Sequence, residues 1–207
     1  MGGRFITVEG GEGAGKTTQA RLLAAALAQA GQPVLLTREP GGAPGAEVLR
    51  DLLLASVIDW SPGAETLLHF AARAEHVDRT IRPALAAGFW VVCDRFVDST
   101  MAYQGYGQGA DRAAIATLAG LLGLVPDLTL MLEMPIGLSL ERLAARGDAA
   151  DRYERLGPAF FTRVAEGFSA ITAAEPGRCV RIPADAPVPE IAGRIRAVLR
   201  ERLGVAL

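Results

Sequence analysis

The stretch Gly10–Thr17, with the sequence Gly-Gly-Glu-Gly-Ala-Gly-Lys-Thr, decides the fold of this chain. It follows the pattern of a glycine, four free positions and then Gly-Lys-Thr, which is typical of a phosphate-binding loop. Glycines let backbone N–H groups approach phosphate oxygens closely, Lys16 adds positive charge at the outer phosphates, and the Thr17 hydroxyl can bind Mg²⁺. The sequence therefore predicts a nucleoside triphosphate site made by Gly10, Gly11, Glu12, Gly13, Ala14, Gly15, Lys16, Thr17 and Thr18.

The flanks of this loop supply the structure that it needs. Residues 5–8 form a short apolar run that predicts a buried strand, and the apolar spacing from Thr18 onward predicts a helix. The positive end of that helix would point at the phosphates. This context argues against a glycine-rich turn that matches the pattern by accident.

Apolar runs at intervals along the rest of the chain predict four further strands. Residues 33–37, 89–93, 127–132 and 179–182 each have the length and composition of a buried parallel strand. Strands that alternate with helices predict a single α/β domain with a parallel sheet. Apolar spacing places the intervening helices near residues 45–56, 64–87, 111–123, 136–145, 158–173 and 188–203.

Length and composition bound the class of protein. Half of the 207 residues are hydrophobic, which suffices for one domain over residues 1–207. The net charge of −2 predicts no general attraction to nucleic acid or anionic membranes, and no apolar run reaches the ~18 residues of a membrane span. The first apolar run is the predicted strand and not a signal segment, so we expect a cytoplasmic protein. The two cysteines lack metal-ligand spacing, so we expect them to be buried thiols.

Two absences in the composition are informative. The chain contains no asparagine, which excludes the Asn-Lys-x-Asp element with which small GTPases recognise guanine. Lys16 is the only lysine, against twenty arginines. A lysine that persists only in this loop is consistent with a chemical requirement there.

Polar residues follow two of the predicted strands. Arg38 comes directly after the second strand, where a positive charge is well placed for an anion, although alone it would be taken for an exposed loop arginine. Asp94 and Arg95 end the third strand. An acid at that position, downstream of a phosphate-binding loop, suits Mg²⁺, and a purely structural ion pair is the alternative.

The helix predicted at 64–87 places Phe70 and Arg73 on one face. A ring beside a guanidinium group could stack on a base and bond its edge, but periodicity alone favours a core phenylalanine and a surface arginine. We expect His69 and His76 to be surface or packed residues. The charged stretch 146–152 between two helices has the composition of a mobile lid, which we place at approximately 146–157.

Taken together, these motifs resemble those of bacterial thymidylate kinases, of the type that carries its catalytic arginine in the lid. The resemblance covers residues 4–174 and implies the P-loop nucleoside monophosphate kinase fold, a five-stranded parallel sheet flanked by helices. The segments that carry it are Phe5-Ile6-x-x-Glu9-Gly10, Thr37-Arg38-Glu39-Pro40-Gly41-Gly42, Phe70-Ala71-x-Arg73-x-x-His76, Asp94-Arg95-Phe96-x-x-Ser99-x-x-Ala102-Tyr103-Gln104-Gly105, Pro126-Asp127-Leu128-Thr129 and Arg146…Asp151-Arg152.

The resemblance implies transfer of the ATP γ-phosphoryl group to dTMP, giving dTDP and ADP for dTTP supply. By position, Phe70 would stack on thymine, Arg73 would bond its O4 side, and Gln104 would help to recognise the base. Tyr103 would crowd the ribose 2′ position and Glu12 would hold the 3′-hydroxyl. These implied roles replace the simpler interpretation of Phe70 and Arg73.

The same resemblance assigns the phosphates and the metal. Arg38 and Arg95 would grip the acceptor phosphate, and Ser99 would also contact dTMP. Thr17 and Asp94 would hold Mg²⁺, the implied cofactor. Phe96 departs from the family pattern, in which tyrosine is frequent at this position.

The implied catalytic groups are Lys16, Arg95, Arg146 and Arg152. Family members carry an additional arginine either in the phosphate-binding loop or in the lid. Residues 11–14 here contain no cation, so we expect the lid to supply an arginine finger in cis, a device worth up to ~10³–10⁵ in rate elsewhere.

Some questions stay open at the level of sequence. Glu9 and Glu133 belong to the pattern without an assigned role. The family suggests a homodimer, for which the helices at 45–56 and 64–87 could supply the surface. The alternatives are another nucleoside monophosphate or deoxynucleoside kinase and, from a different class, a P-loop ATPase that acts as a switch. A non-catalytic nucleotide-binding module does not agree with the intact Lys16 and Thr17.

Overall fold

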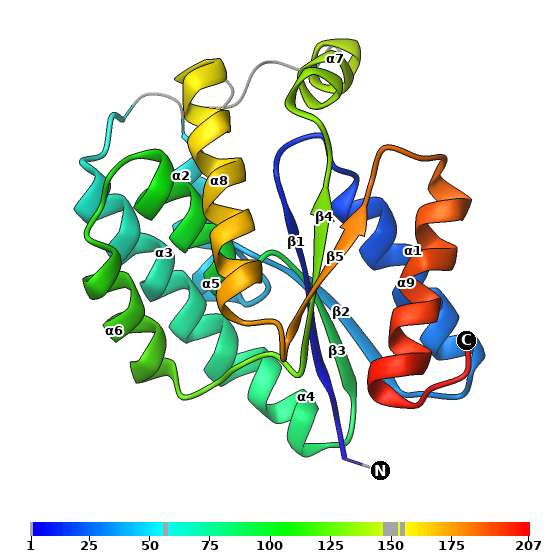
Figure 1. The fold of residues 1–207 in the computed structure, drawn as a ribbon. Helices are drawn as coiled ribbons and strands as arrows, with labels where there is room; N and C mark the ends of the chain where they lie inside the picture. The colour runs from blue at the N-terminus through cyan, green and yellow to red at the C-terminus, as the bar shows by residue number, and fades with distance from the viewer. Residues whose placement is uncertain (1, 56–57, 147–152, 154–155) are drawn as a thin grey trace.

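A computed structural model describes residues 2–55, 58–146, 153 and 156–207. Five strands form one parallel sheet in the order β2-β3-β1-β4-β5 (Figure 1), which confirms the predicted fold class. The strands are β1 (Phe5–Gly10), β2 (Val34–Arg38), β3 (Trp90–Asp94), β4 (Leu128–Glu133) and β5 (Cys179–Pro183).

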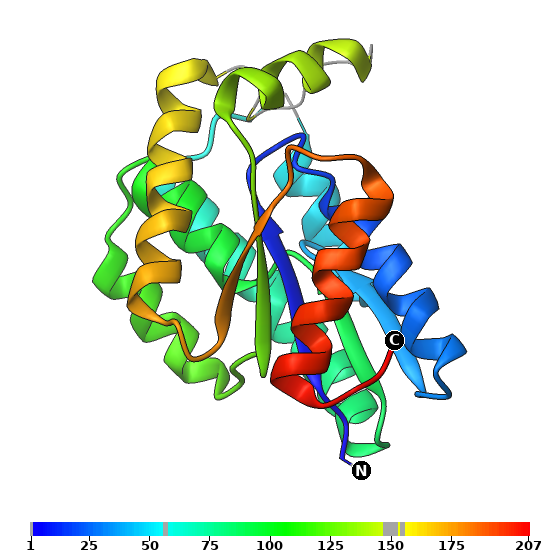
Figure 2. The ribbon, with the colours of Figure 1, turned by 45° about the vertical axis from the view of Figure 1, so that its right-hand side comes forward.

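Successive side chains of a strand point to opposite faces of the sheet, so the hydrophobic core is divided between the two faces. In β1, Ile6 and Val8 pack with apolar residues of α1 (Lys16–Gln29) and α9 (Val188–Leu203). Phe5 belongs to a separate cluster that includes Phe96. Figures 1 and 2 show α1 and α9 on one face of the sheet and a layer made of more helices on the other face. Because both faces are covered, the strands are nearly continuous apolar runs, as the sequence predicted.

The helical layer on the second face contains the elements that shape the site. Its longest member begins as α3 (Pro62–His76), where the Ser61 side chain caps the first turn. The other members are α2 (Pro44–Leu54), α5 (Val97–Thr100), the π-helical segment η2 (Met101–Gly107), α6 (Arg112–Leu122) and α8 (Pro158–Ala174). The helix α7 (Ile136–Arg146) follows β4 and lies beyond the end of that strand (Figures 1 and 2).

The helix predicted at 64–87 is helical from residue 62 to residue 86 but is not uniform. A π-helical segment, η1 (Val77–Ile81), separates α3 from α4 (Arg82–Ala86). Pro83 explains the interruption, because proline has no N–H and its ring clashes with the carbonyl one turn earlier. A wider turn before Pro83 lets the helical path continue.

The strand order places two loops side by side. Val8 of β1 and Arg38 of β2 both pair with Asp94, the last residue of β3. β1 also lies next to β4, so the order of connection reverses beside β1, and ligands of open parallel sheets bind at such a point. The phosphate-binding loop after β1 and the Asp94–Arg95 pair therefore share one crevice. Within the described part of the chain, no helix is long and apolar enough to cross a membrane.

Candidate active site

The phosphate-binding loop has the backbone that its glycines predict. Gly13 and Gly15 have φ angles of 69° and 86°, and a Cβ atom on Gly10 would lie 2.4 Å from the carbonyl oxygen of Leu132. Lys16 begins α1, is buried, and donates from Nζ to the Gly11 carbonyl at 2.6 Å. Burial, and next the nearby Arg95, lower the pKa of Lys16 to about 8. The loop thus presents a helix N-terminus and one buried amine to an anion.

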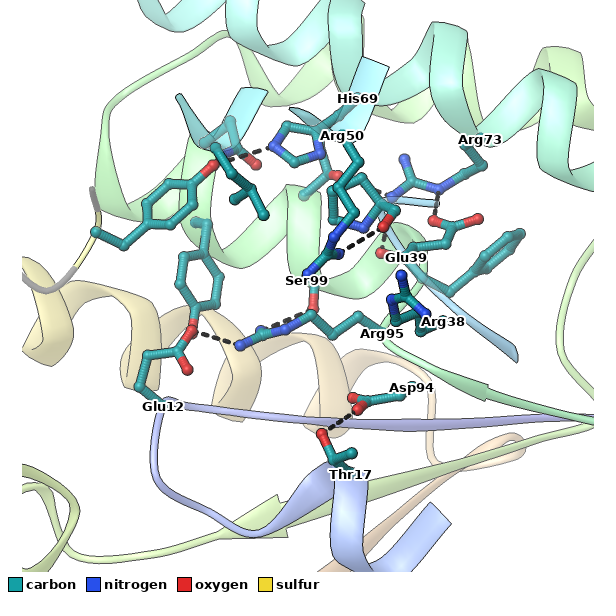
Figure 3. A pocket seen from close by; sticks show the side chains of 17 residues that line it. Glu12, Thr17, Arg38, Glu39, Arg50, His69, Arg73, Asp94, Arg95 and Ser99 are labelled. Carbon is teal, nitrogen blue, oxygen red and sulfur yellow. Dashed lines mark hydrogen bonds and ion pairs between the residues drawn. The ribbon is translucent and has the colours of Figure 1, made fainter. Parts of the chain in front are cut away.

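Thr17 and Asp94 meet at the edge of this loop. The Thr17 hydroxyl donates to Asp94 Oδ2 at 2.5 Å (Figure 3). Asp94 Oδ1 is buried and has no hydrogen-bond partner among the described residues, a state that calls for a water or an ion. A hydroxyl and a carboxylate are ligands that Mg²⁺ accepts alongside substrate phosphates, so the predicted metal residues fit the ion. The described residues hold no cluster of three or more His, Cys, Asp or Glu suited to a metal.

Arg95 adopts an unusual backbone conformation. Its φ of 72° makes it the one non-glycine residue with positive φ in the described chain, which costs of the order of 1–3 kcal/mol. Its own N–H bonds to the Val8 carbonyl at 3.0 Å, and the next amide, that of Phe96, bonds to Glu9 at 2.7 Å. These bonds hold the turn that directs the Arg95 side chain toward Glu12.

Glu12, Arg95 and Tyr103 form a tight group. The Arg95 guanidinium pairs with Glu12 Oε1 and lies 5.1 Å from the centre of the Tyr103 ring, while the Tyr103 hydroxyl donates to the same Glu12 oxygen at 2.9 Å. Burial alone would raise the pKa of Glu12, but the charges of Arg95 and Lys16 outweigh it and lower that pKa to about 2. Burial raises the pKa of the Tyr103 phenol. Glu12 is therefore a charged acceptor and Tyr103 a neutral donor.

A cavity of about 240 Å³ opens beside this group (Figure 3). Nearly all of the residues predicted to bind dTMP line it, together with the two predicted metal residues. Those lining residues are Glu12, Thr17, Arg38, Arg73, Asp94, Arg95, Ser99, Tyr103 and Gln104. Phe70 is not among the residues that line the cavity; it is buried, and its ring centre lies 4.9 Å from the Arg73 guanidinium.

Arg73 is buried, in contrast to the surface position that periodicity alone favours. Its Nε bonds to Glu39 at 2.6 Å, and its Nη2 bonds to the Phe96 carbonyl and to the Thr100 hydroxyl, both at 3.0 Å. Nη1 has no partner within the described residues. The wall of the cavity, to which Arg73 belongs, therefore contains a buried donor without a partner.

Arg50 is a residue of the cavity that the sequence argument missed. It lies on α2, lines the cavity, and donates to the Pro40 carbonyl at 2.6 Å. Burial, and next the charge of Arg38, lower its pKa, and Arg95 acts in the same direction. Figure 3 shows Arg38, Arg50 and Arg95 in the middle of the view, among the other side chains that line the cavity. The only sequence signal was a basic residue within the apolar spacing of the helix predicted at 45–56.

The two glutamates that lacked a role lie in different surroundings. Glu9 is fully buried and accepts from the Phe96 and Ser99 amides and from the Ser99 hydroxyl, the last at 2.5 Å. Burial, and next the charge of Asp98, raise the pKa of Glu9 to about 7. Glu133 instead forms a partly exposed ion pair with Arg181 at 2.8 Å. Glu9 thus supports the start of α5, directly behind Arg95.

The two histidines of α3 are packed inside. His76 Nδ1 lies 3.0 Å from Glu39, and its Nε2 lies 2.7 Å from the Thr37 hydroxyl. His69 lines the cavity, with Nε2 at 3.1 Å from the Tyr153 hydroxyl.

The predicted lid lies mostly outside the described residues. This is true of Arg152 and of residues 147–152 and 154–155 in general. Arg146 is the last residue of α7, and its side chain is not described. The predicted catalytic roles of both arginines stay predictions.

The sequence and the structure of this chain are similar to those of known proteins that fit the geometry of the site. The family model described as thymidylate kinase matches residues 8–195. A thymidylate kinase of Gluconobacter oxydans is 54% identical to this chain, and the alignment covers 98% of this chain and 97% of that protein. A thymidylate kinase of Caulobacter vibrioides is 52% identical, and the alignment covers 98% of this chain and 99% of that protein. The crystal structure of thymidylate kinase from Ehrlichia chaffeensis superposes with a TM-score of 0.79 at 36% identity and covers 97% of this chain and 99% of that one. Fold, crevice and sequence agree, and the chain belongs to the thymidylate kinase family.

Proposed function

We propose that this chain, as one catalytic domain over residues 1–207, transfers the γ-phosphoryl group of ATP to dTMP and gives dTDP and ADP for dTTP supply. The observation that carries the proposal is the shared crevice, in which a phosphate-binding loop faces a group of three arginines across Thr17 and Asp94. Membership of the thymidylate kinase family argues against the two alternatives. These were another nucleoside monophosphate or deoxynucleoside kinase, and a P-loop ATPase that acts as a switch.

The acceptor phosphate would be held by Arg38, Arg50 and Arg95. Guanidinium groups match phosphate oxygens in pairs of parallel hydrogen bonds, which fixes position as well as charge. Arg38 is 54% exposed and bonds to Glu47, so it can turn toward a phosphate at small cost. Arg50 and Arg95 already line the cavity.

The nucleoside would extend from these arginines toward Arg73 and Gln104. Arg73 Nη1 supplies a donor for O4 of thymine, because no described residue occupies it. Charged Glu12 would accept from the 3′-hydroxyl, and the Tyr103 ring would leave little room for a 2′-hydroxyl. Phe96 lines the cavity and could contact the base, while the predicted stacking of Phe70 stays a prediction.

Mg²⁺ would be held by Thr17 and Asp94 and, when bound, would offset negative charge on the ATP phosphates. Lys16 would neutralise charge from the other side. Phosphoryl transfer depends mainly on in-line placement and charge neutralisation. Because residues 11–14 supply no cation, we assign the remaining positive charge to Arg146 and Arg152.

The proposal is tested by coupled ADP release with Mg·ATP and a panel of dTMP, dUMP, dCMP, AMP and GMP, with a control that lacks an acceptor. We expect strong turnover with dTMP and little with the others. Preferred turnover of another acceptor would contradict the assigned base site. ADP release that needs no acceptor would indicate an ATPase.

We further propose a homodimer that forms through α2 and α3. Val48 and Leu67 on these helices are 69% and 59% exposed, and Leu52 is partly exposed beside them. Light scattering at several concentrations should show the dimer, and a monomer at all of them would contradict it. A cytoplasmic location and the lack of nucleic-acid or membrane partners stay predictions from composition.

A further inference from the structure

A buried polar cluster lies beside the predicted base site. We call it the Glu65 cluster and define it by the hydrogen bonds that the described residues show among Glu65, His69, Gln104, Gln108 and Tyr153. His69, Gln104 and Tyr153 line the cavity, whereas Glu65 and Gln108 do not. Glu65, on α3, is fully buried, and Gln104, on η2, is nearly so. A buried carboxylate therefore lies directly behind a residue that faces the ligand.

The hydrogen bonds of this cluster fix the orientation of the Gln104 amide. Gln104 Nε2 donates to Glu65 Oε1 at 2.8 Å and to the Tyr153 hydroxyl at 3.2 Å. A carboxylate accepts hydrogen bonds, so the amide nitrogen, rather than the amide oxygen, must face Glu65. Tyr153 donates to the same carboxylate at 2.6 Å and Gln108 at 3.2 Å, which supports its acceptor role from other directions.

The opposite end of the Gln104 amide is consequently an acceptor. No described residue donates to Gln104 Oε1, and Gln104 lines the cavity. Arg73 lines the same cavity, and its Nη1 is a buried donor with no partner among the described residues. A base edge placed against this wall would meet a donor from Arg73 and an acceptor from Gln104.

This pair suits thymine and uracil and opposes cytosine. Thymine and uracil carry an acceptor at O4 next to a donor at N3–H, whereas cytosine carries a donor at N4 next to an acceptor at N3. A base whose donors and acceptors are reversed leaves buried polar groups unpaired, and such sites reject analogues strongly. If the Gln104 amide were flipped, its nitrogen would face the base and could donate to N3 of cytosine. Only the mismatch between Arg73 and the N4 amino group would then disfavour cytosine.

We propose that Glu65 is a specificity-determining positioning residue that holds the Gln104 amide in the orientation selecting thymine over cytosine. Glu65 does not line the cavity, so it acts through Gln104. The inference rests on the proposed function, since it requires dTMP as the acceptor. Selection of thymine over cytosine would then depend on the Glu65 carboxylate behind the base site as well as on the Gln104 amide.

The test uses Glu65→Gln, which keeps the size of the side chain but can donate as well as accept. Formation of dTDP is followed chromatographically to obtain KM for dTMP, with dUMP and dCMP as competitors to obtain their inhibition constants. These constants do not depend on the fraction of folded enzyme. With two amide orientations about equally populated, KM for dTMP and the constant for dUMP should rise by no more than about twofold. The constant for dCMP should fall about tenfold or more, because Gln104 can now donate to N3.

Two further variants separate positioning from general damage. Gln108→Met removes another donor to the same carboxylate but no lining residue, and it should leave the dCMP-to-dTMP ratio unchanged. In a Gln104→Leu background, Glu65→Gln should have no further effect on that ratio, because the group it positions is gone.

Three results would overturn the inference alone: an unchanged dCMP-to-dTMP ratio in Glu65→Gln, a parallel rise of all three constants, or an effect that persists with Gln104→Leu. A wild-type chain that binds ATP but forms no dTDP would overturn the proposed function, and this inference with it.

Discussion

Glu9 offers a test in which stability should change with pH in an unusual direction. The Glu9 carboxyl is fully buried and holds the Phe96 and Ser99 amides behind Arg95. Glu9→Gln replaces it with an amide that has one acceptor and one donor end, like the protonated carboxyl. The variant should keep the hydrogen bonds at the start of α5 but cannot ionise.

The size of the effect follows from the pKa of Glu9. Burial raises that pKa from an ordinary 4.5 to about 7. Below pH 4.5 the group is protonated in both the folded and the unfolded chain. Between pH 4.5 and 7 the unfolded chain releases the proton first, so the free energy of unfolding falls as pH rises, and the loss is complete above pH 7. At about 1.4 kcal/mol per pH unit, the free energy of unfolding of the wild type should fall by about 2–3 kcal/mol relative to that of Glu9→Gln between pH 5 and pH 8.

Urea unfolding of both proteins, monitored by circular dichroism between pH 5 and pH 8, measures this difference. Comparing the two proteins at each pH cancels the titration of groups that do not interact with Glu9. Glu133→Gln is the matched control, because it makes the same substitution at a carboxyl that is 37% exposed and pairs with Arg181. A difference between wild type and Glu9→Gln that stays constant from pH 5 to pH 8 would refute the reasoning.

The other expectations concern catalysis. Arg152→Ala should lower kcat much more than it raises KM for dTMP, and an unchanged kcat would remove the arginine-finger assignment. Arg50→Ala should raise KM for dTMP by about tenfold or more, since a charged hydrogen bond to phosphate is lost; steady-state kinetics against Arg79→Ala, an exposed arginine of the same helical layer, supplies the comparison. Thr17→Ala should raise the Mg²⁺ concentration needed for half-maximal rate, as a magnesium titration at fixed ATP would show, and an unchanged requirement would speak against Thr17 as a ligand.

The sheet was predictable because its signal is local. Each strand is an apolar run, and the loop that follows β1 carries its own chemical pattern. The π-helical segment at Val77–Ile81 was not predicted, since apolar spacing does not distinguish it from regular helix. Pro83 was the available clue, because a proline within a helical pattern disturbs the preceding turn.

The site was harder to predict wherever a partner is distant in sequence. Arg73 is buried because Glu39, 34 residues away, pairs with it inside the fold. Periodicity carries no information about such a partner and favours the surface. Glu9 and Arg50 have the same difficulty, since the groups that they contact come from other elements. Only the order of motifs along the chain, compared with a known family, pointed to the acceptor site.

The buried amine of Lys16 has a practical consequence for labelling chemistry. It is the only lysine in the chain, so a reagent that acylates amines meets a single lysine target. Its pKa of about 8 leaves a larger share of neutral, nucleophilic amine near pH 8 than an ordinary lysine has. A nucleotide bound in the loop would cover that amine. The number of acyl groups counted by mass spectrometry would then report occupancy of the phosphate-binding loop without any turnover.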